Sequence, residues 1–258
     1  MLILVTILFL LLSTISIRKF RSVKQVIPKQ GQVIPKHVYQ THKTRGYIQS
    51  NKVLTSATDS WKNHTEFKYS FYDDTECETF IKNNFDNYTY KAYMSLQKPV
   101  MKSDFWRYCV IYKNGGIYAD TDTICLENPN MFIIDDVELV VAPEPSFLFC
   151  QWVFAAPKNS PVLKSVIDLM VYRILHPQDR ISPEEYGRNY VYYFTGPMVF
   201  TDGIQARLNY ATKDREPYKK PMRYSNSSIL HIFEKNNFHK NKVKHLYYGS
   251  HKGGWKTT

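Results

Sequence analysis

Residues 101–127, MKSDFWRYCVIYKNGGIYADTDTICLE, constrain the fold of this chain more than any other stretch. The first half has the spacing of an amphipathic helix, and Asp104 and Arg107, three residues apart, share one face of that helix. The two glycines at residues 115–116 end the apolar run, and a glycine in the left-handed (αL) conformation commonly ends a helix in this way. The pattern therefore predicts a helix, a glycine turn and a short buried strand over residues 117–119.

Two carboxylates, Asp120 and Asp122, follow this strand. On an extended backbone, residues two apart point to the same side, so both carboxylates are aimed into one small volume. Their repulsion costs free energy unless a cation lies between them. Oxygen ligands of this kind suit Mg²⁺ or Mn²⁺, so Asp120 and Asp122 are the predicted metal ligands. The alternative is an Asp-x-Asp that only caps a turn.

Strands alternate with helices over the rest of the chain. Apolar periodicity and Pro/Gly positions predict strands over residues 36–41, 67–72, 137–142, 148–156, 229–233 and 243–247, and helices over residues 76–85, 89–97, 160–175, 183–194 and 198–208. This order predicts an α/β fold with a mixed central sheet flanked by helices. Ligands of such folds bind at the carboxyl ends of strands, which is where the acidic pair falls.

The chain begins with an apolar run, residues 2–17, that contains no charged residue. The run is slightly shorter than the ~17–25 residues that span a bilayer comfortably. A cleaved signal peptide is the alternative, but no basic segment precedes the run and no small-residue cleavage site follows it. We therefore expect a transmembrane anchor at residues 1–17, a basic linker at residues 18–32 and one folded domain at residues 33–258.

The formal net charge of +11 raises the alternative of a nucleic-acid-binding protein. The basic excess, however, lies at the two ends of the chain: residues 1–58 hold nine basic and no acidic residues, and residues 212–258 hold 11 basic and three acidic ones. Such a distribution fits a membrane-proximal arm and a tail that faces a phosphorylated ligand. We therefore expect no nucleic-acid partner.

The segment that runs from Ser103 through Asp104, Arg107 and the glycine pair to Asp120-Thr-Asp122 resembles the DXD sugar-binding region of family 32 glycosyltransferases. This family includes yeast Golgi mannosyltransferases and inositol-phosphoceramide mannosyltransferases. Residues 34–41, Trp61, residues 69–74, residues 195–197 and the terminal segment to Trp255 are also similar to the family, so the resemblance covers about residues 33–255. It implies a GT-A nucleotide-diphospho-sugar transferase fold for residues 33–258.

The resemblance also implies roles for individual residues. Asp122 would bind the metal directly, and Asp120 would contact the ribose and sugar of the donor and reach the metal through water. Asp104 and Arg107 would hydrogen-bond the transferred sugar, since a guanidinium offers a rigid fork of donors. For Arg107 the alternative is a salt bridge to Asp104 on the helix surface.

Four further residues complete the site that the resemblance implies. Tyr118 would support the donor from the strand, although core packing is the alternative. His251 would supply a late metal or diphosphate contact, unless it is only an exposed tail histidine, and Trp255 would close over the pyrophosphate. His42 stands where the family packs an aromatic residue near the nucleotide base, which leaves the base preference open.

These features predict a metal-dependent glycosyltransferase that uses Mn²⁺ or Mg²⁺. It would move a hexose from a nucleotide-sugar donor, GDP-mannose or a UDP-sugar, to a glycan, glycolipid or protein acceptor, with retention of configuration. Gln151 stands where the family often has Asn near the acceptor, so the acceptor is left open. We expect a single-pass protein of a Golgi, ER or other intracellular membrane, with the side of the membrane open. A membrane-tethered, catalytically degenerate carbohydrate-binding protein is the alternative function.

Overall fold

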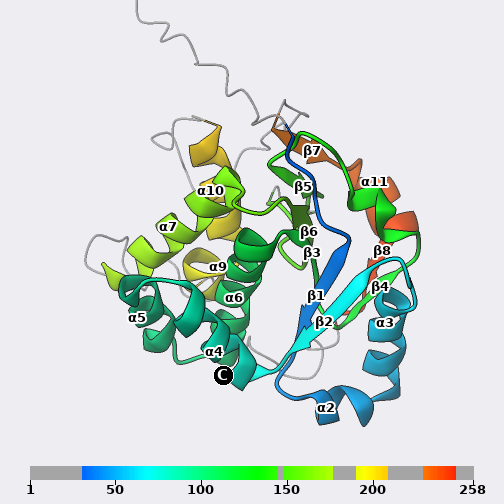
Figure 1. Cartoon of the computed structure of the whole chain (residues 1–258), viewed down its shortest axis with the longest axis horizontal. Coiled ribbons are helices and arrows are strands. Elements are labelled where there is room, and N and C mark those ends of the chain that lie inside the picture. Colours follow the sequence, from blue (N-terminus) through cyan, green and yellow to red (C-terminus); the bar gives the residue numbers. More distant parts are fainter. Residues whose placement is uncertain (1–30, 145–147, 177–189, 209–228, 248–258) are drawn as a thin grey trace, which may run out of the picture.

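A computed structural model describes residues 31–144, 148–176, 190–208 and 229–247 of the chain. Its centre is a six-stranded mixed sheet with the strand order β2-β1-β3-β6-β5-β7 (Figure 1). The strands are β2 (Lys68–Tyr72), β1 (His37–Thr41), β3 (Gly116–Ala119), β6 (Val153–Ala156), β5 (Leu139–Val141) and β7 (Leu230–Ile232). β2, β1 and β3 run parallel, β6 is antiparallel to both of its neighbours, and β5 and β7 are parallel.

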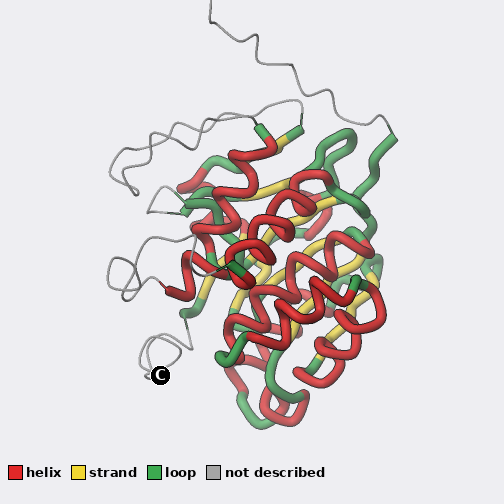
Figure 2. Tube along the Cα trace, turned by 90° about the vertical axis from the view of Figure 1, so that its left-hand side faces the viewer, coloured by secondary structure: helices red, strands yellow, loops and turns green. Residues whose placement is uncertain are grey.

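A second sheet has only two antiparallel strands, β4 (Thr123–Cys125) and β8 (Val243–His245). Helices surround the main sheet, and Figure 2 shows them covering the face that is turned to the viewer. The helices are α2 (Arg45–Gln49), α3 (Lys52–Lys62), α4 (Asp74–Asn84), α5 (Asn87–Ser95), α6 (Pro99–Asn114), α7 (Pro161–Leu175), α9 (Tyr190–Phe194), α10 (Pro197–Arg207) and α11 (Lys235–Asn237), with short helical turns η1 (Pro129–Phe132) and η5 (Phe238–Lys242).

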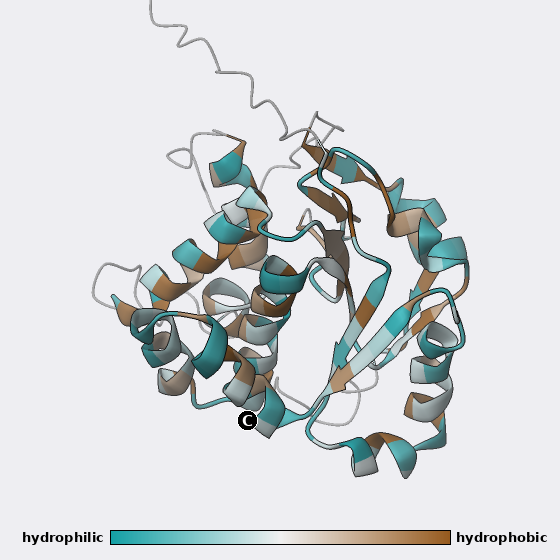
Figure 3. Ribbon diagram, in the orientation of Figure 1, coloured by the Kyte–Doolittle hydropathy of each residue, from teal (hydrophilic) through white to brown (hydrophobic). Residues whose placement is uncertain are grey.

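The sheet separates two hydrophobic cores because alternate residues of each strand point to opposite faces. Phe154 of β6 packs into the core beneath α6, α7 and α10, whereas its neighbour Val153 packs into a second core with Trp61 of α3. The central strands are coloured as hydrophobic in Figure 3, which agrees with the complete burial of β3 and β6. A sheet buried on both faces is thus the frame that holds the site.

The turn between α6 and β3 depends on its two glycines. Gly115 and Gly116 have φ values of 70° and 112°, a region that side chains disfavour. A Cβ on Gly116 would also lie only 2.5 Å from the carbonyl oxygen of His37, because β3 passes close beside β1 here. The turn therefore sets where β3 begins, and with it where the following carboxylates lie.

Most of the predicted elements are confirmed. The helix predicted over residues 160–175 is α7, with Ser160 as its N-cap and Pro161 in its first turn. The strand predicted over residues 148–156 is shorter, since β6 holds only its last four residues. Of the helix predicted over residues 183–194, only α9 lies in the described chain.

The helix predicted from residue 101 begins earlier, because Pro99 is its first residue, and it is less amphipathic than expected. All eight residues from Asp104 to Ile111 are buried, since the helix lies between the sheet and its neighbours α4 and α7. The predicted anchor at residues 1–17 and nearly all of the predicted linker lie outside the described residues. Within the described ranges, no helix combines the length and the apolar character that a membrane span requires.

Candidate active site

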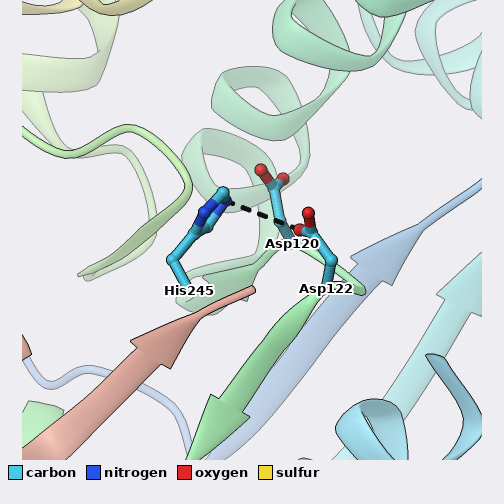
Figure 4. Close-up of side chains that lie close together, drawn as sticks. All are labelled: Asp120, Asp122 and His245. Carbon is cyan, nitrogen blue, oxygen red and sulfur yellow. Dashed lines mark ion pairs between the residues drawn. The ribbon is translucent and has the colours of Figure 1, made fainter. Parts of the chain in front are cut away.

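The predicted carboxylate pair lies at the carboxyl end of β3, where a tight turn brings Asp122 beside Asp120 (Figure 4). Thr123 closes the turn, because its amide and its hydroxyl both donate to the carbonyl of Asp120, at 3.1 and 2.6 Å. The amide of Asp120 donates to the carbonyl of Trp152 at 2.8 Å, which joins the turn to the strand β6. Both carboxylates stay partly accessible, with side-chain exposures of 24% for Asp120 and 18% for Asp122.

His245 is a third candidate ligand at this place. The pairing of β8 with β4 sets His245 opposite Thr123, and its Nε2 lies 3.5 Å from Oδ1 of Asp122. One ligand atom from each of Asp120, Asp122 and His245 lies within 4.8 Å of the other two. Adjacent ligands of an octahedral ion at about 2.1 Å are about 3 Å apart, so a small inward movement of these side chains would fit a divalent ion. Two carboxylates and an imidazole are a donor set that suits Mn²⁺.

Arg107 connects the helix α6 to the carboxylate pair. Its Nη2 lies 3.0 Å from Oδ1 of Asp104 and 3.1 Å from Oδ1 of Asp120, and its guanidinium packs over the ring of Tyr118 at 4.8 Å. The hydroxyl of Tyr118 donates to the same Oδ1 of Asp120 at 2.5 Å. Arg107 and Tyr118 therefore both contact Oδ1 of Asp120, which leaves Oδ2 for other ligands.

Asp104 lies beneath Arg107 and is only 1% exposed. The side-chain amide of Gln151 donates to its Oδ1 at 3.2 Å, and the hydroxyl of Thr195 donates to its Oδ2 at 3.0 Å. Burial raises the pKa of Asp104 to about 7, against the opposing charge of Arg107 and with a further increase from Asp120. Asp104 is thus a buried partner that fixes the guanidinium. The salt bridge named as the alternative for Arg107 is present, but it is buried and not on the helix surface.

The pKa of Arg107 changes in the opposite sense to that expected from burial alone. Desolvation lowers it, but the nearby Asp120, Tyr118 and Asp104 together outweigh this effect and raise it above its ordinary value. The guanidinium is therefore a permanent positive charge at the edge of the carboxylate pair. Its Nε is buried and has no hydrogen-bond partner among the described residues.

Tyr118 and His42, two predicted donor-binding residues, have different environments. Tyr118 is only 1% exposed, so it contributes to the site through the hydrogen bond from its hydroxyl to Asp120. His42 follows β1 at the same edge of the sheet and stacks on Tyr47, with ring centroids 4.6 Å apart. Burial lowers the pKa of His42 although the nearby Asp120 opposes this, so the ring is neutral near pH 7.

The structure adds residues that the sequence did not point to. His245 lies in the strand predicted over residues 243–247, but its pairing with β4 was not foreseen. Gln151 was noted only for the acceptor, and Thr195 only as part of a similar segment, whereas both hold Asp104. The two predicted late contacts, His251 and Trp255, lie outside the described residues.

The sequence of this chain is similar to those of known glycosyltransferases. Residues 48–138 match the family described as "Glycosyltransferase sugar-binding region containing DXD motif". The chain is 28% identical over 202 residues to the initiation-specific alpha-1,6-mannosyltransferase of Schizosaccharomyces pombe, covering 69% of this chain and 49% of that protein. It is 23% identical over 230 residues to the Candida albicans protein of the same name, covering 76% and 59% of the two chains. The chain thus spans about half the length of these relatives.

A solved structure supports the mixed α/β fold described above. The PaToxG glycosyltransferase superposes with a TM-score of 0.50 and 20% identity, covering 68% of this chain and 70% of that one. An identity at this level supports the fold and not the activity. The matched DXD region includes α6, β3 and both carboxylates, which are the parts of the site described above. Residues 48–138 thus match the glycosyltransferase sugar-binding region that contains the DXD motif, and this match and the mannosyltransferase relatives support a glycosyltransferase of family 32.

Proposed function

We propose that this chain is a metal-dependent glycosyltransferase that moves a hexose from a nucleotide-sugar donor to a hydroxyl of a glycan, lipid or protein acceptor, with retention of configuration. The observation that supports this most directly is the cluster of Asp120, Asp122 and His245 beside the fixed guanidinium of Arg107. The names of the two yeast relatives support mannose as the hexose.

Asp122, His245 and the Oδ2 of Asp120 would hold the ion, with Mn²⁺ or Mg²⁺ as the candidates. A bound divalent ion supplies the positive charge that stabilises a departing nucleoside diphosphate. Tyr118 and Arg107 keep the Asp120 carboxylate in one orientation, so the ligand atoms are ordered before the donor arrives.

Arg107 and Asp104 act together on the donor. Asp104, with Gln151 and Thr195 behind it, fixes one side of the guanidinium. The two Nη groups of Arg107 are therefore held in a fixed direction, where they contact the carbonyl of Gln151 and the carboxylate of Asp120. We assign these groups to the hydroxyls of the transferred sugar and to the charge that develops on its diphosphate. Asp104 is then a positioning residue, unless its carboxylate becomes accessible when the donor binds.

We expect the acceptor to attack the face of the sugar from which the diphosphate leaves, because attack on that face retains the configuration without a covalent intermediate. The bond between the anomeric carbon and the β-phosphate oxygen breaks, and its electron pair leaves with the diphosphate. The acceptor oxygen forms the new bond to the same carbon and passes its proton to a diphosphate oxygen. His251 and Trp255 stay predicted contacts of that diphosphate, and residues 1–17 stay a predicted anchor to an intracellular membrane.

The test is hydrolysis of a panel of nucleotide sugars by the purified chain with Mn²⁺, in wild type and in Asp122→Ala. We expect the variant and the EDTA-treated wild type to lose activity. Asp168→Ala, which removes an exposed carboxylate that pairs with Lys164 on α7, should keep the activity. Circular dichroism and thermal melting establish that each variant is folded.

Full activity of Asp122→Ala or of the wild type in EDTA would refute the metal-dependent mechanism. A wild type that binds sugars but cleaves no donor of the panel, with Mn²⁺ present, would support the degenerate carbohydrate-binding alternative.

A further inference from the structure

Glu144 lies at the same edge of the sheet as the carboxylate pair. β3 and β5 are both antiparallel to β6, so they run in one direction, and Ile117 and Val140 both lie opposite Ala155. The two strands are two strand spacings apart, or about 10 Å. Glu144 comes four residues after Val140, and the two carboxylates come three and five residues after Ile117. The chain therefore carries Glu144 beyond this edge of the sheet as far as it carries the carboxylate pair.

Trp152 joins Glu144 to the site. The backbone carbonyl of Trp152 accepts from the amide of Asp120 at 2.8 Å, and its ring centroid lies 4.8 Å from that of His245. Its indole Nε1 donates to Oε1 of Glu144. Trp152 is only 6% exposed, whereas Glu144 stays partly exposed. One buried indole thus contacts both the candidate metal ligand His245 and the carboxylate of Glu144.

The backbone around Glu144 is fixed as well. The amide of Glu144 donates to the carbonyl of Leu148 at 2.7 Å, and Nε2 of His239 lies 2.9 Å from the carbonyl oxygen of Pro143. Together with the indole of Trp152, these contacts hold the carboxylate in one direction. A side chain that is ordered before a ligand arrives loses little conformational entropy when the ligand binds.

Two tyrosines lie beside Glu144. Burial raises the pKa of Tyr247, and the negative charges of Glu144 and Asp122 raise it further. Burial also raises the pKa of Tyr192, again with contributions from Glu144 and from Asp104. Each phenol is therefore close both to Glu144 and to a carboxylate of the proposed donor site.

The backbone of Tyr247 has a φ of 52°, in the left-handed region that a tyrosine seldom adopts. Its ring packs against His245, with ring centroids 4.1 Å apart, and Tyr247 is still 43% exposed. Costly backbone conformations of this kind cluster at functional sites. Glu144 and the accessible ring of Tyr247 thus offer a carboxylate and an aromatic face on one side of the candidate metal ligands.

We propose that Glu144 binds the acceptor and that the acceptor group is a sugar unit, with two adjacent hydroxyls on the carboxylate of Glu144 and its C–H face on Tyr247. The inference rests on the proposed function, because it needs a sugar donor at the carboxylate pair. An ionised carboxylate has about four sites for hydrogen-bond donors, and Trp152 uses one of them. Glu144 orients the acceptor through these neighbouring hydroxyls and takes no proton from the hydroxyl that reacts.

The same chemistry disfavours the other acceptor classes. An alkyl chain over Glu144 would bury its charge without a hydrogen bond, which costs free energy. A serine or threonine side chain offers one hydroxyl and no ring, so it leaves part of the carboxylate unsatisfied. The sugar unit can belong to a glycan or to the headgroup of a glycolipid, since both present the same ring.

Steady-state transfer kinetics of the full chain with Mn²⁺ and the donor that the wild type hydrolyses test the proposal. The acceptors are the methyl glycosides of mannose, glucose and galactose, the monodeoxy and octyl analogues of the one that reacts best, and a threonine-containing peptide. We expect transfer to a sugar and not to the peptide. Glu144→Gln, which keeps an oxygen for Trp152, should raise the KM of the sugar acceptor about tenfold and that of the donor by less than about twofold. Glu78→Gln, an exposed glutamate on α4, is the matched control and should change neither KM.

The deoxy analogues separate contact with the acceptor from a structural role of Glu144. If Glu144 binds a hydroxyl, removal of that hydroxyl should raise the KM of the wild type about tenfold and leave that of Glu144→Gln nearly unchanged. Equal losses of the variant on every acceptor would mean that Glu144 only supports Trp152, and they would overturn the proposal. A lower KM for the octyl than for the methyl glycoside, with the same dependence on Glu144, identifies a glycolipid as the source of the sugar, and equal values identify a glycan.

The outcomes also separate this proposal from the function on which it rests. Hydrolysis of the donor without transfer to any of these sugars, or transfer to the peptide in their place, would refute the sugar acceptor while the donor site is retained. If no nucleotide sugar is cleaved with Mn²⁺ present, the proposed function is refuted, and the role of Glu144 fails with it. The wild-type ranking of sugar, deoxy sugar and peptide needs no variant, so it decides even where Glu144→Gln disturbs folding.

Discussion

Replacement of Arg107 by methionine would remove the cation that pairs with Asp104 in the described part of the chain, and it would keep a long apolar side chain at this position. Arg107 has a side-chain exposure of 6%, and Asp104 of 2%, so the change leaves a carboxylate in the core without its ionic partner. Loss of one member of a buried ion pair typically costs about 3–5 kcal/mol. For a domain of this size, we expect the melting temperature to fall by roughly 6–20 °C.

The stability that Arg107→Met loses should depend on pH, because the carboxyl group of Asp104 titrates. Its pKa is about 7 in the folded wild type, against about 3.9 in an unfolded chain. A carboxyl group with a raised pKa binds more protons in the folded state, so its effect lowers stability as the pH rises from about 4 to about 7. Without Arg107 this pKa rises further, and the window extends to higher pH. The difference between wild type and Arg107→Met should therefore be small near pH 5 and large near pH 8.

The assay is thermal and urea unfolding of both proteins with EDTA at each pH. Arg45→Met is the control, because Arg45 also contacts two carboxylates, Asp73 and Glu76, but is 48% exposed. Its loss should cost about 1 kcal/mol or less. Addition of Asp104→Asn to Arg107→Met should restore part of the stability, since the unpaired buried charge is then removed. Equal losses for the two arginines, or a loss that does not change with pH, would refute this account.

Three further outcomes are expected. His245→Ala should weaken Mn²⁺ binding by at least about tenfold in titration calorimetry, while alanine at the half-buried His176, at the end of α7, should leave it unchanged. Gly116→Ala should destabilise the chain by about 1–3 kcal/mol in urea unfolding because its Cβ would meet the His37 carbonyl, whereas Gly46→Ala, with open space around it in α2, should stabilise it by about 0.5–1 kcal/mol. Mn²⁺ at 100 times its dissociation constant should raise stability by about 2.7 kcal/mol in a melting series, and a flat series would contradict a metal site.

The stretch from α6 to Asp122 could be predicted because its determinants are local. Spacing along the helix, the two glycines and the strand period act within a few residues of each other. The structure has the helix, the glycine turn and the strand in this order, although the helix is buried on more sides than its spacing indicates. Ser160 and Pro161 mark the start of α7 for the same reason, since a cap and a first-turn proline depend only on neighbouring residues.

The depth of the ion pair and the third ligand could not be predicted from local pattern. The spacing of Asp104 and Arg107 places them on one face, but burial of that face depends on the neighbours α4 and α7 and on Thr195, far along the chain. His245 reaches the carboxylates through a pairing between two strands of three residues, which are too short to carry a distinctive period. Pairing between strands that lie far apart in the chain is the feature that is hardest to predict from a single sequence.

The short sheet of β4 and β8 links ion affinity to chain topology. Its pairing brings together residues 123–125 and 243–245, so the ion site closes a loop of more than a hundred residues. An ion shared by Asp122 and His245 would fasten the late strand to the centre of the chain, and by linkage the strand pairing would contribute to the affinity for the ion. Substitutions in β4 or β8 that touch no ligand atom would then change the affinity for the metal ion. The stability of this strand pair would therefore contribute to metal binding at Asp122 and His245.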